Sequence, residues 1–195
     1  SFSTSGAKLE VSFDDTDFVT DPRELTGSFI FRPDSALAND TSMKHLLRIG
    51  DSADPQNLAL ELNVQRVTQN AKELFRFELI PINQNTGGGF CPPVTVDFEL
   101  DHDSQDEVPI ILSTKASNPL VLQLWVDGVE AQLTDCSRPA NYGTPNFQTW
   151  ILGGAQSNGG APGYSIDDLR IWTSYQDISA LPENEDTNNA LSADC

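Results

Sequence analysis

The stretch LALELNVQRV, residues 58–67, alternates apolar and polar side chains. A period of two predicts a β-strand whose two faces meet different surroundings. The stretch LFRFELI, residues 74–80, repeats the pattern. Both are therefore predicted to be half-buried strands, with Leu58, Leu60, Leu62, Val64, Phe75, Phe77 and Leu79 facing a core and Glu61, Asn63, Gln65, Arg76 and Glu78 facing outward.

Similar apolar or alternating stretches recur through most of the chain, and no segment shows a capped helical stripe. They cover residues 8–13, 28–31, 46–50, 94–100, 108–114, 120–126 and 129–134, with glycine- and proline-rich loops between them. Many short strands with turn signals predict an all-β, two-sheet antiparallel sandwich. We expect this domain over residues 1–180 and a polar tail or linker over residues 181–195.

The charge of the chain narrows the classes of partner. The 195 residues carry 29 acidic against 11 basic side chains, a formal net charge of -18. Such a surface repels phosphate backbones and anionic lipid, so we expect no nucleic-acid partner. No run approaches the roughly 20 apolar residues that cross a bilayer, so we expect no membrane insertion. An acidic surface suits cations or a neutral ligand, or is simply solvated.

Three cysteines allow one disulfide. If residues 94–134 form a four-strand meander, Cys91 and Cys136 lie at the same end of one sheet. A disulfide between them is then sterically reasonable and would contribute about 3–4 kcal/mol through chain entropy. Cys195 would be free or paired elsewhere, and a pairing of Cys136 with Cys195 stays open as an alternative.

Polar side chains on the outward phases of several strands suggest a binding surface. If these strands lie in one sheet, their side chains form a polar groove with an indole. Amides and carboxylates bind sugar hydroxyls, and an aromatic face stacks on sugar C–H groups. The candidate ligand-binding residues are Arg76, Glu78, Asp97, Glu99 and Trp125. The alternative for Trp125 is partial burial under a loop.

The stretch GYSIDDLRIW, residues 163–172, breaks its alternation at Asp167 and Asp168. A phase slip of this kind predicts a β-bulge that turns the two carboxylates away from the core. There they can cap backbone N–H groups, pair with Arg170 or hold a hard cation.

The order of several motifs resembles the laminin-G-like, concanavalin A-like jelly rolls. The motifs are Trp125-Val126-Asp127-Gly128-Val129, Ile151-Leu152-Gly153-Gly154 and the closing strand Ile166 to Trp172, with LEVSFDD near the start. The resemblance implies a curved two-sheet sandwich in a superfamily that includes lectins, adhesion modules and glucanases. It also implies a structural calcium ion between the first and last strands, at the matching positions Asp14, Asp15, Asp17 and Asp168.

The laminarinase-type glucanases on a similar jelly roll suggest a catalytic alternative. Their strand motif of a Glu nucleophile, an Asp and a Glu acid/base resembles Glu99, Asp101 and Asp103, with Asp at the third position. Two carboxyl groups about 5–5.5 Å apart would suit retaining hydrolysis. The shorter third side chain makes this trio a poorer fit than the family motif.

We therefore predict a non-catalytic, secreted or cell-surface recognition module that binds glycan or an extracellular protein with the help of calcium. The first alternative is a glycan-cleaving enzyme that uses the carboxylates of residues 99–103. The second is a structural or cell-adhesion module of a larger surface protein. The sequence makes no prediction of the oligomeric state.

Overall fold

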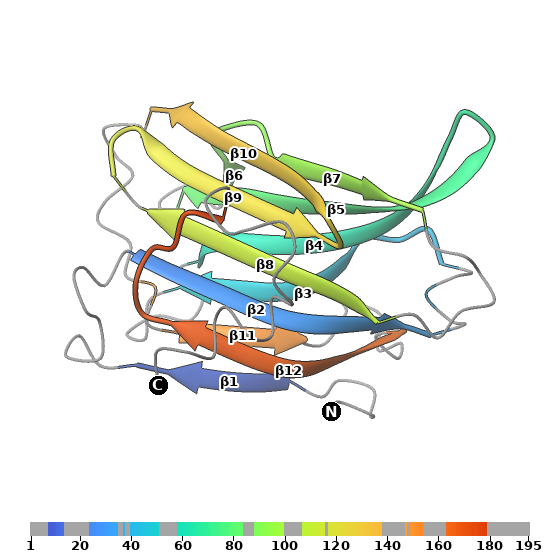
Figure 1. Ribbon diagram of the computed structural model, residues 1–195, viewed down its shortest axis with the longest axis horizontal. Coiled ribbons are helices and arrows are strands. Elements are labelled where there is room, and N and C mark those ends of the chain that lie inside the picture. The colour runs from blue at the N-terminus through green and yellow to red at the C-terminus, as the bar shows by residue number, and fades with distance from the viewer. Residues whose placement is uncertain are drawn as a thin grey trace.

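The structure, a computed structural model, is a sandwich of two antiparallel β-sheets (Figure 1). This confirms the predicted fold class. The structure describes residues 8–13, 24–34, 37, 40–50, 58–83, 88–99, 107–115, 117–137, 147, 149–153 and 163–178.

The larger sheet, called sheet A, has seven strands in the order β1-β11-β3-β4-β5, and both β6 and β7 pair with β5. Its strand β4 contains the alternating stretch that predicted the fold, and β5 contains the second one. The strands of sheet A are β1 (Lys8–Ser12), β3 (Lys44–Gly50), β4 (Leu58–Gln69), β5 (Lys72–Asn83), β6 (Gly88–Gly89), β7 (Val94–Phe98) and β11 (Thr149–Gly153).

The smaller sheet, called sheet B, has five strands in the order β10-β9-β8-β2-β12 and lies nearer the viewer in Figure 1. Its strands β8, β9 and β10 follow one another as a meander. The strands of sheet B are β2 (Glu24–Pro33), β8 (Val108–Lys115), β9 (Leu120–Val126), β10 (Val129–Cys136) and β12 (Tyr164–Trp172).

The core lies between the sheets and is made by the inward phase of each strand. Leu60, Val64 and Phe77 are completely buried there, as their alternation predicts. Across the core, Gly27 of β2 lies against the ring of Trp150 of β11. A Cβ atom at Gly27 would lie 2.5 Å from the Trp150 ring, so the absence of a side chain makes this contact possible.

The predicted four-strand meander over residues 94–134 is wrong. Strand β7 pairs with β5 in sheet A, and the chain then crosses to sheet B before β8 begins. Alternation specifies which side of a strand is buried, but it does not identify the neighbouring strand.

The predicted disulfide is nevertheless present, between Cys91 and Cys136, with a Cα–Cα distance of 6.0 Å. Cys91 precedes β7 at the edge of sheet A, and Cys136 ends β10 at the edge of sheet B. The bond therefore joins the two sheets rather than two ends of one sheet. It also excludes the alternative pairing of Cys136 with Cys195, which lies outside the described residues.

Two other expectations concern membrane insertion and the C-terminal tail. Within the described ranges, no helix has the length and apolar character that a bilayer crossing needs. The proposed tail, residues 181–195, lies outside the described residues, so the boundary at residue 180 stays a prediction.

Candidate functional site

Polar side chains gather on the outer face of sheet A, the face turned away from sheet B. The strand register places His45, Asn63, Glu78 and Thr95 side by side across four strands. Gln65, Arg76 and Asp97 form the next row, and Arg48 lies opposite Glu61. We call this surface the polar face; its residues are His45, Arg48, Glu61, Asn63, Gln65, Arg76, Glu78, Thr95 and Asp97.

Hydrogen bonding fixes the imidazole of His45 at the centre of the polar face. Its Nδ1 lies 2.7 Å from Oδ1 of Asn63, and because an amide oxygen only accepts, Nδ1 is the donor. Asn63 is 2% exposed although it points outward, since its neighbours surround it. Glu61 Oε2 lies 3.9 Å from the same ring nitrogen, and its side chain is 16% exposed. The centre of the face is thus tightly packed and half-buried.

The predicted ligand residues Arg76 and Asp97 form an ion pair between β5 and β7. Arg76 donates from Nε to Oδ1 at 2.7 Å and from Nη2 to Oδ2 at 2.8 Å. This two-bond geometry holds the pKa of the Asp97 carboxyl below its usual value and raises the pKa of Arg76. The pair is a preformed, planar element at one side of the polar face.

Three charged side chains of the polar face behave differently. Arg48 and Glu61 lie directly opposite each other on β3 and β4, yet in the described part of the chain no ion pair joins them. The Nε of Arg48 is buried and has no hydrogen-bond partner. Glu78, another predicted ligand residue, also makes no hydrogen bond or ion pair with the described residues. Buried or half-buried polar groups usually have partners, so these groups call for an explanation.

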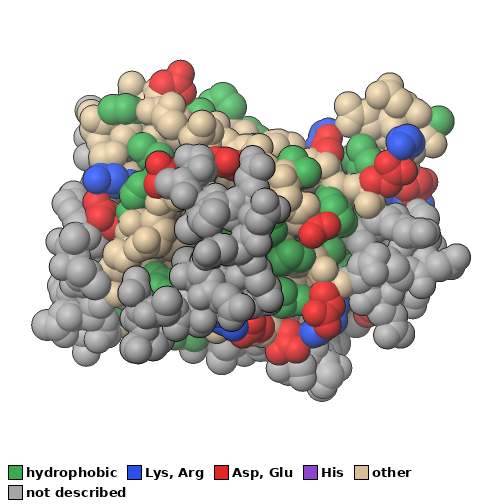
Figure 2. Space-filling model, viewed as in Figure 1, with side chains coloured by type: hydrophobic (Ala, Val, Ile, Leu, Met, Phe, Trp, Pro, Cys, Tyr) green, Lys and Arg blue, Asp and Glu red, His purple; other side chains and the backbone are tan. Residues whose placement is uncertain are grey.

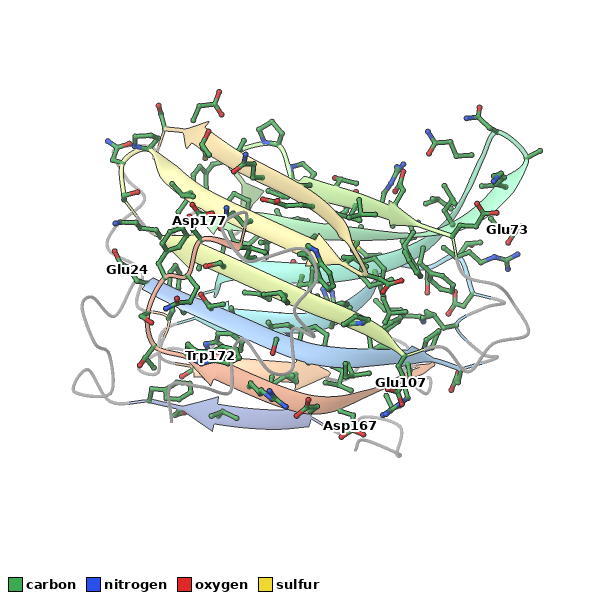
Figure 3. All side chains as sticks on the ribbon, viewed as in Figure 1. Glu24, Glu73, Glu107, Asp167, Trp172 and Asp177 are labelled. Carbon is green, nitrogen blue, oxygen red and sulfur yellow. A yellow bond between two sulfur atoms is a disulfide. The ribbon has the colours of Figure 1, made fainter. Side chains whose placement is uncertain are left out.

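Trp125 does not belong to this surface. It lies on β9 of sheet B, on the opposite outer face of the sandwich. There it packs with Trp172 against Ile111 and Ile178. Figure 3 shows Trp172 at the end of β12 and Asp177 on the segment that leaves this strand and runs over sheet B. We call this segment, residues 173–178, the strap. The predicted groove therefore has no indole from Trp125, and the alternative of partial burial is confirmed.

The strap is held by a row of polar side chains on the outer face of sheet B. Gln123 donates to Asp177 Oδ1 at 2.7 Å and accepts from the Ile178 N–H at 3.0 Å and the Tyr175 hydroxyl at 3.2 Å. Thr26 accepts from the Gln176 N–H at 2.9 Å. The polar groups of this face are thus used in holding the strap.

The proposed catalytic carboxylates lie elsewhere. Strand β7 ends at Phe98, so Glu99 is just beyond it, and Asp101 and Asp103 lie outside the described residues. Glu99 accepts a hydrogen bond of 2.7 Å from Lys72 at the base of the β4–β5 turn, and both side chains are more than half exposed. The β4–β5 hairpin forms a lobe that projects from the body (Figure 2). Glu99 is therefore at a solvated rim, and catalysis by the trio stays a prediction.

The predicted bulge in β12 is confirmed. The register with β2 shifts between Asp167 and Arg170, and Asp168 has a φ of 49°, a left-handed conformation that Asp tolerates. Arg170 donates to both oxygens of Asp168, at 3.2 and 3.0 Å. Arg32 donates to Asp167 at 2.7 Å and so lowers the pKa of that carboxyl.

The calcium prediction rests on residues that the structure describes only in part. Asp14, Asp15 and Asp17 lie outside the described residues, whereas Asp168 is paired with Arg170. Among the described residues, no three His, Cys, Asp or Glu side chains are grouped closely enough to hold a metal ion. The calcium site stays a prediction.

Sequence reasoning missed Arg48 and the pairing of His45 with Asn63. Arg48 stands between Leu47 and Ile49, in a short stretch that was recognised by its apolar residues. Its outward phase was the available signal. The contact of His45 with Asn63 depends on the register of β3 against β4, which contains a bulge between His45 and Leu47. No spacing in the sequence predicts that register.

No family model matches the chain, and no curated protein matches it. Among solved structures, it is similar to the binding domain of botulinum neurotoxin serotype D, with 13% identity over 90% of this chain and 38% of that one, and a TM-score of 0.57. The ligand binding domain of that serotype in complex with N-acetylneuraminic acid matches with 13% identity, over 89% and 38% of the two chains, and a TM-score of 0.55.

An alginate lyase from Pseudomonas aeruginosa matches with 11% identity, over 88% of this chain and 74% of that one, and a TM-score of 0.52. At such identities these likenesses show the fold alone, a β-sandwich found in binding domains and in a polysaccharide-degrading enzyme. The chain spans 38% of the toxin domains it resembles.

Proposed function

We propose that the chain is a non-catalytic recognition module of the laminin-G-like type that binds glycan through the polar face of sheet A. One observation carries the proposal: Arg48, Glu61 and Glu78 are charged groups on a compact face, and within the described residues none of them has a hydrogen bond or a close ion pair. Glu61 only approaches His45 at 3.9 Å, and Glu78 interacts with Arg76 only through its charge. A ligand with many hydroxyl groups would supply those partners.

The chemistry of the face favours a sugar over an apolar ligand. Carboxylates accept hydrogen bonds from hydroxyl groups, and the Asn63 amide and the His45 ring can contribute further donors and acceptors. The preformed Arg76–Asp97 pair adds a planar polar edge without requiring reorganisation on binding.

The proposal includes the cellular location of the module and the class of its ligand. A disulfide forms and persists in oxidising compartments, which supports a secreted or cell-surface protein. The structural neighbours include a toxin binding domain in complex with N-acetylneuraminic acid, which supports glycan as the ligand class. A role in adhesion within a larger surface protein is compatible with the same binding face.

The test is a glycan-binding screen with matched charge variants. We expect wild-type protein to bind a subset of immobilised glycans. The double variant Glu61→Gln and Glu78→Gln should bind them about tenfold or more weakly, because charged acceptors become neutral. Glu130→Gln serves as the control, since Glu130 is exposed on β10 of sheet B. A wild-type protein that binds no glycan, or a control that loses binding as strongly, contradicts the proposal.

We retain calcium as part of this proposal. An ion beside Asp168 would compete with Arg170 and would need six to eight oxygen ligands in all. Thermal unfolding in calcium chloride and in EDTA tests it: calcium should raise the midpoint of the wild type but not that of Asp168→Asn. Equal midpoints for the wild type in the two solutions would remove calcium from the proposal.

A further inference from the structure

Arg48 differs from the other arginines that the structure describes. Arg32, Arg66, Arg76 and Arg170 each form an ion pair with a carboxylate. For Arg48, in the described part of the chain, there is no such pair, although the protein has 29 acidic and only 11 basic side chains. In so acidic a protein, an arginine that has no carboxylate partner among the described residues is unexpected on electrostatic grounds alone.

The position of Arg48 makes the missing partner more significant. It stands on β3 between Ile151 of β11 and Glu61 of β4. Ile151 is 7% exposed, so one side of Arg48 is apolar and largely dry. The buried Nε lacks an acceptor, and a buried donor without a partner costs about 1–3 kcal/mol. The protein keeps this unfavourable group at the β3 edge of the surface that we assign to binding.

We propose that Arg48 binds a carboxylate group of the glycan, so that the ligand is an acidic sugar such as a uronic or sialic acid. This inference rests on the proposed function and adds the class of sugar. The planar guanidinium presents parallel N–H groups that match the two oxygens of a carboxylate.

The side chains around Arg48 leave one position for the carboxylate of the glycan. Glu61 on β4 and Glu78 on β5 repel an anion, so the carboxylate is excluded from their side of Arg48 and hydroxyl groups are favoured there. Arg76 does not compete for the anion, because Asp97 already occupies its fork with two hydrogen bonds. Arg48 is thus the specificity-determining residue of the polar face.

The test uses calorimetric titration with oligouronates and sialylated oligosaccharides, each beside the same compound with its carboxylates reduced to primary alcohols. We expect the wild type to prefer at least one acidic compound by about tenfold or more over its reduced counterpart. Arg48→Gln should bind the two members of the pair equally, and Arg48→Lys should retain only part of the preference. Arg170→Gln, which removes the same charge from sheet B, should behave like the wild type.

Several outcomes overturn the inference. Equal binding of acidic and reduced compounds by the wild type does so, as does an unchanged preference in Arg48→Gln. It is also overturned if the wild type prefers glycans whose only acidic groups are sulfates over glycans with carboxylates. If reduced or neutral glycans bind and the Glu61→Gln, Glu78→Gln variant weakens them, the proposed function stands and only the acidic-sugar assignment falls. Binding to no glycan removes both. Thermal midpoints of all variants verify that they are folded.

Discussion

The outer faces of the two sheets carry similar side chains but use them differently. On sheet B, the buried amide of Gln123 has three hydrogen-bond partners, all from the strap. On sheet A, the equally buried amide of Asn63 has one hydrogen-bond partner among the described residues, His45, and its charged neighbours Arg48 and Glu78 have none there. The polar groups of one face are satisfied by the chain itself, whereas several polar groups of the other face have no partner among the described residues.

The largest expected effect comes from the bond that joins the two sheets. Replacing Cys91 and Cys136 by Ser removes a cross-link over a sequence separation of 45. We expect a loss of about 4 kcal/mol in the free energy of unfolding, from the greater entropy of the unfolded chain. Urea unfolding of the double variant, beside the wild type with and without reductant, measures it. A loss below about 1 kcal/mol would mean that the sheet edges hold together without the bond.

The two buried amides allow a matched test of the difference between the faces. Gln123→Leu should cost about 2–3 kcal/mol, because the Ile178 N–H and the Asp177 carboxylate lose their partner. Asn63→Leu should cost about 1 kcal/mol. Urea unfolding compares the two variants directly. Equal losses would contradict the view that only sheet B uses its outer face for stability.

Within sheet A, Arg76 and Arg48 allow a comparison of an arginine that has an ion pair with one that has none among the described residues. Arg76→Leu should lower the free energy of unfolding by up to about 1 kcal/mol, since it leaves Asp97 without its partner. Arg48→Leu should leave stability unchanged or raise it, because an unpaired buried donor disappears. Stabilisation together with lost acidic-glycan binding is the expected trade between stability and function. A clear destabilisation by Arg48→Leu would contradict the absence of a partner.

The smallest expected effect is on the stability of the fold at acidic pH. The pKa of Asp97 is lowered, mainly by the hydrogen bond from Arg76, so the pair stabilises the fold above the unfolded-state pKa of about 4. That contribution is lost as pH falls through the lowered, folded-state pKa. Asp97→Asn should therefore flatten the acid side of the stability profile below about pH 4. Asp167→Asn is the comparison variant at the edge of sheet B; its carboxylate is more exposed and should matter less.

The sequence was sufficient for the strands and for the side of each strand that is buried. Leu62 and Phe77 are in the core and Glu78 and Asp97 are outside it, because a period of two is a local property of the chain. The bulge at Asp168 was predictable for the same reason, since it interrupts that period.

Partners distant along the chain were not predictable in this way. The sequence identified the outward phase of Trp125 and of Arg76, but not that they belong to different sheets. Likewise, β7 has the alternation of a meander strand although it pairs with β5. Arg48 was singled out because it has no ion-pair partner among the described residues. Only the three-dimensional structure can show that such a partner is missing.

The disulfide between the sheet edges has a mechanical consequence for the folded chain. Cys91 and Cys136 enclose a separation of 45 residues, which would extend to about 150 Å if pulled straight. While the bond is intact this length cannot be released, so pulling on the chain ends extends only the parts outside it. The oxidation state of the two cysteines would thus set how far the chain extends when its ends are pulled apart.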